Sequence, residues 1–194
     1  DDAFQTLEAS WRNLYQLAHQ TRAHYQDTVD LRLLSLSLYE LHRDLTISHS
    51  EFDDSALYQH IISNEFDHAG GEPFGIMLVD FSFDHRVNRD IDSISVLTEL
   101  ANIGSVGFCP MICTADARLL DLSGWQELTP TIAEKTSFTE SRYRRWMRLC
   151  DQQISQFLSC VAVRTRIRPA YQDSTMAIRN RFFNEAITDH EDIL

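Results

Sequence analysis

Residues 74–83 read FGIMLVDFSF, and this largely apolar run decides the fold class. A short apolar run that follows turn-forming residues is typical of a strand that is buried on both faces of a sheet. The stretch AGGEP at 69–73 supplies the glycines and the proline that separate such a strand from a preceding helix. We therefore predict an interior strand over 74–83.

Amphipathic and apolar segments alternate on both sides of this strand. Helices are expected over 3–24 and 39–47, from a cap at Asp53 or Asp54 to about Phe66, from a cap at Asp90 to Gly104, over 115–121, and from a capping box at 137–140 to Leu158. Further strands are expected over 31–38, 106–113 and 161–167. This alternation predicts an α/β layered fold, in which helices flank a central mixed sheet and the N-terminal helix is long.

The composition indicates one soluble globular domain. The chain has 194 residues, of which 43% are hydrophobic and 24% are charged, and glycine and proline are too few for a low-complexity chain. The net charge of -12 argues against a protein that binds nucleic acid, and no apolar stretch is long enough to insert into a membrane. We expect an α/β domain over 1–170, in a fragment of a longer chain, and a polar tail over 171–194 that is mobile or ordered by a partner.

Cysteine and histidine spacing gives no sign of a metal site or a cofactor. Cys109 and Cys113 are separated by three residues, but no second close pair completes a zinc site. We interpret both as small buried side chains of a protein in a reducing cytosol. None of the eight histidines has a neighbour at a metal-binding spacing, so no cofactor is predicted.

Two carboxylates leave an enzymatic alternative open. Asp80 lies near the end of the apolar run, and Asp84 follows four residues later. Carboxylates at the ends of strands in α/β folds can hold a metal or attack phosphate. The pair is therefore compatible with a metal-dependent hydrolase or phosphotransferase, although the only lysine, Lys135, is too far along the chain to assist in the usual way. The alternative is a carboxylate that meets solvent or a backbone N–H.

Arginines cluster in the last third of the chain. Four lie on the helix expected after 140, and three alternate along the strand expected over 161–167 and just beyond it. They are Arg142, Arg144, Arg145 and Arg148 on the helix, and Arg164, Arg166 and Arg168 on the strand. Alternate strand residues share a face. This basic surface is either a docking face for an acidic protein or a solvated face that pairs with local acids.

Four motifs in a fixed order carry a resemblance to a known family. LEASWR stands at 7–12, EFD at 51–53 with SAL at 55–57, GGEPFG at 70–75 before the strand that contains Asp80, and Trp125 before Glu127 and Leu128. In this order and spacing they resemble the large subunit of the type VI secretion contractile sheath. The similarity extends from residue 7 to about residue 150. The last third departs from the family pattern, and Asn13 stands where the family has glycine.

The resemblance implies a structural protein with no catalytic residue. It implies assembly with a small sheath subunit into a helical sheath around an inner tube, in the bacterial cytoplasm, and contraction that drives protein secretion. The motif residues would then be structural, anchoring a helix and setting a turn, and the strand arginines Arg164, Arg166 and Arg168 would be candidates for binding a partner. The structural set is Leu7, Glu8, Ser10, Trp11, Arg12, Gly70, Gly71, Glu72, Pro73, Gly75 and Asp80.

Overall fold

A computed structural model describes residues 2–25, 27–47, 52–86, 91–129 and 138–162. The chain divides into two units, of which the first comprises Asp1–Ser35 and Val163–Leu194 and the second comprises Leu36–Ala162. The boundary expected at residue 170, and the tail beyond it, lie outside the described residues.

The long N-terminal helix is confirmed as α1 (Asp2–Tyr25). The strand predicted over 31–38 is wrong, because residues 29–37 have no regular structure. A local signal decides where the next helix begins. The Ser37 hydroxyl accepts from the Glu40 N–H at 3.2 Å, and the Glu40 carboxylate accepts from the Ser37 N–H at 2.7 Å. This capping box starts α2 (Leu38–Ile47), which confirms the helix expected over 39–47.

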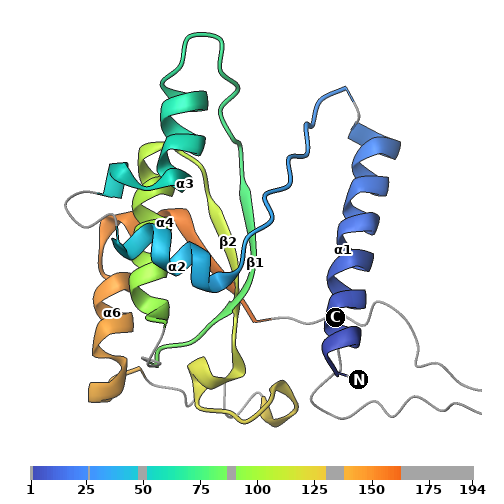
Figure 1. Cartoon of the computed structure of the whole chain (residues 1–194). Helices are drawn as coiled ribbons and strands as arrows, with labels where there is room; N and C mark the ends of the chain where they lie inside the picture. The colour runs from blue at the N-terminus through green and yellow to red at the C-terminus, as the bar shows by residue number, and fades with distance from the viewer. Residues whose placement is uncertain (1, 26, 48–51, 87–90, 130–137, 163–194) are drawn as a thin grey trace, which may run out of the picture. The chain divides into compact units, whose positions relative to one another are not determined.

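The second unit is built on a parallel sheet of β1 (Met77–Phe83), β2 (Met111–Ala115) and β3 (Leu158–Val161), in that order (Figure 1). The α/β class is confirmed. The sheet was expected to be mixed, but the three described strands are all parallel. The strands therefore start at one edge of the sheet, here the amino edge, and end at the other, the carboxyl edge.

The prediction that the first strand is buried on both faces is wrong. Side chains of β1 alternate between half-buried and exposed, and Leu78 is 56% exposed. Two features explain this. Among the described strands, β1 lies at the side of the sheet and pairs only with β2. The helices of this unit cover the face that carries Met111 and Cys113, so Leu78 and its register partner Ile112 lie on the opposite face.

The sequence predicted a helix capped by Asp53 or Asp54. These two residues instead belong to the short η1 (Phe52–Asp54), and the helix follows it. It begins as α3 (Ala56–Tyr58) and continues as η2 (Gln59–Phe66), a π-helix. The cap is Ser55, whose hydroxyl accepts from the Tyr58 N–H at 3.0 Å. The carboxylate of Asp44, from α2, accepts hydrogen bonds from the N–H groups of Ala56 and Leu57 at 2.9 and 3.0 Å. The first N–H groups of the helix are therefore bonded without the aspartate caps that were predicted.

Helix α4 (Ser93–Val106) connects β1 to β2, and its ends differ from the prediction. Its cap is Asp92, which accepts from the Ser95 N–H, whereas the expected cap Asp90 lies outside the described residues. Gly104 does not end the helix. A Cβ at Gly104 would lie 2.7 Å from the Cys109 carbonyl oxygen, so this glycine permits a close approach of backbone inside the helix.

The last helix is shorter than predicted, and its expected capping box includes residues that are not described. After η3 (Ala117–Leu120), η4 (Trp125–Glu127) and η5 (Ser141–Tyr143), helix α6 covers only Arg144–Cys150. The Ser155 hydroxyl then donates to the Cys150 carbonyl oxygen at 2.9 Å, competing with a helical bond. The segment η6 (Gln153–Phe157) leads into β3, which starts three residues before the predicted strand.

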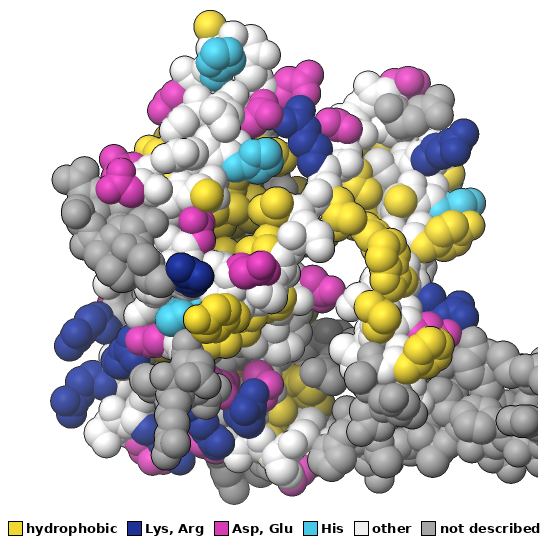
Figure 2. Space-filling model, in the orientation of Figure 1, with side chains coloured by type: hydrophobic (Ala, Val, Ile, Leu, Met, Phe, Trp, Pro, Cys, Tyr) yellow, Lys and Arg dark blue, Asp and Glu magenta, His cyan; other side chains and the backbone are white. Residues whose placement is uncertain are grey.

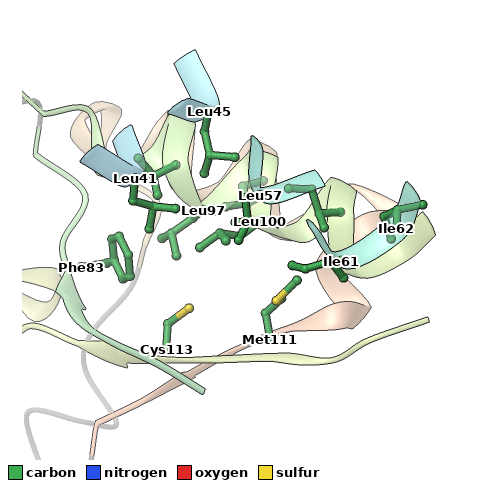
Figure 3. Packing of buried hydrophobic residues seen from close by; sticks show 13 residues of the cluster. Leu41, Leu45, Leu57, Ile61, Ile62, Phe83, Leu97, Leu100, Met111 and Cys113 are labelled. Carbon is green, nitrogen blue, oxygen red and sulfur yellow. The ribbon is translucent and has the colours of Figure 1, made fainter. Parts of the chain in front are cut away.

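The core lies between the sheet and its covering helices (Figure 3). Leucine and isoleucine side chains from α2, α3, η2 and α4 meet Phe83, Met111 and Cys113 from the strands. Cys109 and Cys113 are buried as predicted, and burial raises the pKa of the Cys113 thiol to about 12. This thiol therefore stays protonated and acts as an apolar side chain. No helix in the described ranges is long and apolar enough to cross a membrane.

Candidate functional site

Polar side chains gather at the carboxyl edge of the sheet. β1 ends at Phe83 and is followed by Asp84 and His85, while β2 ends at Ala115 and is followed by Asp116. The Asp116 N–H donates to the Phe83 carbonyl oxygen at 2.8 Å and ties the two strand ends together. In α/β sheets this edge is where ligands usually bind, so it is the first place to look for a site.

Asp121 lies at the centre of this cluster. Its carboxylate accepts hydrogen bonds from the Tyr143 hydroxyl and, at 3.2 Å, from Arg86, and it forms an ion pair with Arg142 at 3.1 Å. The imidazole Nε2 of His85 lies 3.9 Å from the same carboxylate. One carboxylate thus joins three segments that are far apart in the chain: the residues after β1, the turn after η3, and η5.

Asp84 and Asp116 share a second arginine. Arg118 makes a two-pronged contact with the Asp116 carboxylate, 2.9 Å at each oxygen, and its Nε lies 3.5 Å from Asp84 Oδ2. Asp84 Oδ2 and His85 Nδ1 are buried and have no hydrogen-bond partner in the described part of the chain. Each buried polar atom without a hydrogen bond reduces the stability of the fold by roughly 1–3 kcal/mol. Ion pairs therefore hold the cluster together, although these two atoms of it lack hydrogen bonds.

The pKa values follow from burial and from these contacts. Burial lowers the pKa of His85, more strongly than the neighbouring Asp121 charge raises it. Burial alone would raise the pKa of Asp121, but hydrogen bonds from Tyr143 and Arg86 outweigh it and lower the pKa. Burial and the hydrogen bond to Asp121 raise the pKa of Tyr143 to about 12. At neutral pH the Asp121 carboxylate is therefore ionised, and the His85 imidazole and the Tyr143 phenol beside it are neutral.

The amino edge of the sheet is apolar. Phe108, in the turn that leads into β2, lies between Phe66 and Phe157, with ring centroids 6.3 and 6.1 Å apart. Phe108 is 71% exposed and has a φ of 49°, in the left-handed region that normally favours glycine. An aromatic side chain that is both exposed and held in a costly backbone conformation marks a candidate contact surface.

Comparisons with known proteins agree with the resemblance in the sequence. The profile of one family, described as the EvpB/VC_A0108 tail sheath N-terminal domain, matches residues 1–194, which is the whole chain. The chain belongs to this tail sheath family. A curated relative, the type VI secretion system sheath protein TssC1 of Pseudomonas aeruginosa, is 28% identical over 183 residues. The matched region covers 94% of this chain and 36% of TssC1, so the chain spans about a third of the length of that relative.

The first family motif lies on α1. Leu7 and Trp11 are 57% and 61% exposed, and Ser10 is also exposed. Glu8 and Arg12 are one turn apart and form an ion pair at 2.8 Å. The two large apolar side chains of this tail sheath motif are therefore exposed among the described residues, and the role of Trp11 as an anchor of the helix stays a prediction.

The second family motif forms the turn between η2 and β1. Gly70 has a φ of 91°, which suits glycine. A Cβ at Gly71 would lie 2.8 Å from the carbonyl carbon of Glu65, so no side chain fits there. The Glu72 N–H donates to the Glu65 carboxylate at 2.8 Å, and Pro73 and Gly75 are exposed. These contacts agree with the interpretation of this tail sheath motif as a turn.

Asp80 and Asp84, the two carboxylates of the enzymatic alternative, lie in different environments. Asp80 is exposed on the open face of β1, whereas Asp84 is buried beyond the end of the strand beside Arg118. Within the described ranges, no group of three His, Cys, Asp or Glu side chains is placed to hold a metal ion.

The two groups of arginines have different outcomes. Arg142 pairs with Glu140 and Asp121, and Arg145 donates to Asp92 at 2.6 Å. These two helix arginines pair with local acids, as one of the two interpretations expected. The strand arginines Arg164, Arg166 and Arg168 lie outside the described residues.

Sequence reasoning missed Asp121, Tyr143 and Phe108. Asp84 and Asp116 each follow an expected strand within a few residues, and parallel strands bring such positions to one edge. That signal could have located the cluster. No comparable signal identifies Phe108, because its exposure and its left-handed backbone become visible only in the structure.

Proposed function

We propose that this chain is part of a sheath subunit of a bacterial type VI secretion system and that it acts by assembly, without catalysis. The observation that carries the proposal is the match of all 194 residues to the tail sheath family. The name of the relative TssC1 supports the specific system. The exposed apolar side chains of Leu7, Trp11 and Leu78 fit a protein that buries surface against neighbours.

In this proposal the subunit pairs with a small sheath subunit in the cytoplasm, and the pairs stack helically around an inner tube. Contraction exchanges one set of contacts between rigid subunits for another and drives protein secretion. Arg164, Arg166 and Arg168 are proposed contacts with an acidic surface of a partner. No nucleic acid and no membrane insertion are part of the mechanism.

The test is to express the complete parent protein together with the small sheath subunit encoded beside it, and to image the product by negative-stain electron microscopy. Hollow tubules that contain both proteins are expected. A soluble parent protein that neither copurifies with the small subunit nor forms tubules would contradict the proposal.

A pair of variants separates folding from assembly. Gly71→Ala should prevent tubules, because the added Cβ collides with the backbone of Glu65. Gly75→Ala, with no atom within 4 Å of the added Cβ, should form tubules like the parent protein. If neither variant forms tubules while both remain folded, the family motif has a direct contact role instead of the proposed structural one.

A further inference from the structure

Acidic and basic residues are separated within the second unit of the chain, Leu36–Ala162. Residues 44–85, from within α2 to just beyond β1, contain nine acidic residues and no lysine or arginine. Residues 141–150, which form η5 and α6, contain four arginines and no acidic residue. Figure 2 shows acidic side chains at the upper end of this unit and basic side chains at its lower left, where α6 lies in Figure 1. Unlike parts of two copies of this unit therefore attract each other.

The basic part divides into paired and unpaired arginines. Arg142 and Arg145 form the ion pairs with local acids described above. Arg144 and Arg148 are exposed, and neither forms an ion pair or a hydrogen bond with another described residue. They are one helical turn apart and so share a face of α6, together with Met147, which is 37% exposed. We name Arg144, Met147 and Arg148 the α6 face.

The acidic part presents a carboxylate beside exposed aromatic rings. Asp67 directly follows Phe66, is exposed, and forms no ion pair with another described residue. Its N–H donates to the Ile62 carbonyl oxygen at 2.8 Å, which ties it to the end of η2. The Phe66 ring lies 6.3 Å from the ring of Phe108, which is 71% exposed. We name Phe66, Asp67 and Phe108 the amino-edge face.

The chemistry of the two faces is complementary. A guanidinium group pairs with a carboxylate and stacks on an aromatic ring, so a carboxylate beside exposed rings suits arginine. The α6 face offers two arginines that have no local acid, and the thioether of Met147 lies between them and packs well against an aromatic ring. The exposed Phe108 ring, held in a costly left-handed backbone, would be covered by this contact.

The two faces differ from each other, so the contact does not close on itself. Each copy uses its amino-edge face on one neighbour and its α6 face on another. Head-to-tail contacts of this kind generate an open helical array. They are therefore compatible with copies that are related by a screw rotation.

We propose that the α6 face of one copy of this chain binds the amino-edge face of the next copy. The placement of this contact in a sheath rests on the proposed function. The contact itself is measured on the chain alone, so its failure is distinguishable from a failure of the parent protein to form tubules.

Charge exchange between two variants tests the pairing. Asp67→Arg and Arg148→Glu are prepared as separate proteins. Each alone should self-associate about fivefold more weakly than the parent chain in sedimentation equilibrium, because like charges then meet in the contact. An equimolar mixture should regain the affinity, because the introduced arginine of one variant meets the introduced glutamate of the other. A mixture that associates no better than either variant alone overturns the proposal.

Matched controls separate this pairing from the change in net charge. Asp54→Arg and Arg43→Glu make the same changes in charge at exposed positions outside both faces. Both should self-associate like the parent chain, and equal urea midpoints should show that all four variants are folded. Controls that weaken association as much as the two face variants would show a general effect of charge and overturn the proposal.

The size of the assemblies tests the head-to-tail arrangement. An open array adds copies as the concentration rises, whereas a two-fold contact stops at a dimer. The affinity should also fall when salt is raised from about 0.05 to about 0.5 M, since the arginines and Asp67 are exposed. A chain that stays monomeric up to about 1 mM, or an assembly that stops at a dimer, overturns the proposal.

Discussion

The two edges of the sheet are built in opposite ways. At the amino edge, the segments that lead into the strands carry glycines in close packing and the aromatic side chains of Phe66, Phe108 and Phe157. At the carboxyl edge, the segments that follow the strands carry a network of acids and arginines around Asp121. In Figure 2, basic and acidic side chains lie close together at the lower end of this unit, toward which β1 runs in Figure 1.

The difference predicts different responses to perturbation. Close packing depends on shape and is insensitive to salt, whereas ion pairs at a partly exposed site weaken as salt screens them. A change at the amino edge should therefore have the same effect at all ionic strengths. A change at the carboxyl edge should depend on salt and pH.

Gly71→Ala should have the largest effect. The new Cβ would lie 2.8 Å from the carbonyl carbon and from the Cα of Glu65, and backbone atoms cannot move aside as a side chain can. We expect a loss of about 3 kcal/mol in the free energy of unfolding, measured by urea titration. The loss should be equal in 0.05 and 1 M salt.

The same motif supplies two controls. Gly70→Ala adds a Cβ in open space but at a φ of 91°, so it should cost about 1–2 kcal/mol through backbone strain alone. Gly75→Ala meets neither problem and should change the stability by less than about 0.5 kcal/mol. An equal effect of all three would show that the turn does not have the close approach described at Gly71.

Asp121→Ala should have the next largest effect. It removes the acceptor for Tyr143 and Arg86 and the ion pair with Arg142, and it leaves an alanine at a φ of 58°. We expect a loss of about 2 kcal/mol in low salt, and a smaller loss in 1 M salt.

Asp121→Asn separates charge from shape at this position. Asparagine tolerates the left-handed backbone and keeps an acceptor for Tyr143, so about half of the alanine effect should remain. A loss for either variant that does not change with salt would remove the proposed distinction between the two edges.

Sequence patterns predicted the parts of this fold that depend on local spacing. The periodicity of α1 and the Gly70–Gly71 turn are local, and the structure agrees with both. The exposure of Leu78 was missed because burial depends on how many strands and helices cover β1. The strand expected over 31–38 was wrong because a capping box at Ser37 starts a helix within its last residues.

For the same reason, the sequence predicted only part of the carboxyl-edge cluster. Asp84 was noted as a strand-end carboxylate, but its neighbours arrive from distant segments. Asp121 lies 37 residues further on, and Tyr143 another 22 residues beyond it. No spacing rule connects positions that only the crossovers through α4 and α6 bring together.

The pH dependence of the free energy of unfolding should reflect the protonation of His85. Burial lowers its pKa in the folded chain, so below the ordinary histidine pKa of about 6.5 the unfolded chain binds more protons than the folded one. Stability should therefore fall as the pH drops from 7.5 to 5.5, by at most about 1.4 kcal/mol, because pH 5.5 lies only about one unit below the histidine pKa of the unfolded chain. The charges that face this imidazole are Asp84, Arg86, Asp121 and Arg142.

His85→Gln is the variant that checks this expectation. Glutamine does not titrate, so urea midpoints measured at pH 7.5 and 5.5 should lie closer together in His85→Gln than in the parent chain. The lowered pKa of Asp121 acts below about pH 4 and does not interfere in this range. An unchanged difference between the two pH values would assign the effect to another group.

Phe108→Asn should have the smallest effect on the isolated chain. Asparagine accepts the left-handed backbone more easily, which offsets the loss of ring contacts with Phe66 and Phe157, so the net change should be below about 1 kcal/mol. If the exposed ring is instead a contact with a neighbour, the same variant should reduce tubule formation by the parent protein while its urea midpoint stays constant. Loss of stability by more than 2 kcal/mol would show that Phe108 belongs to the core of the amino edge and not to its surface.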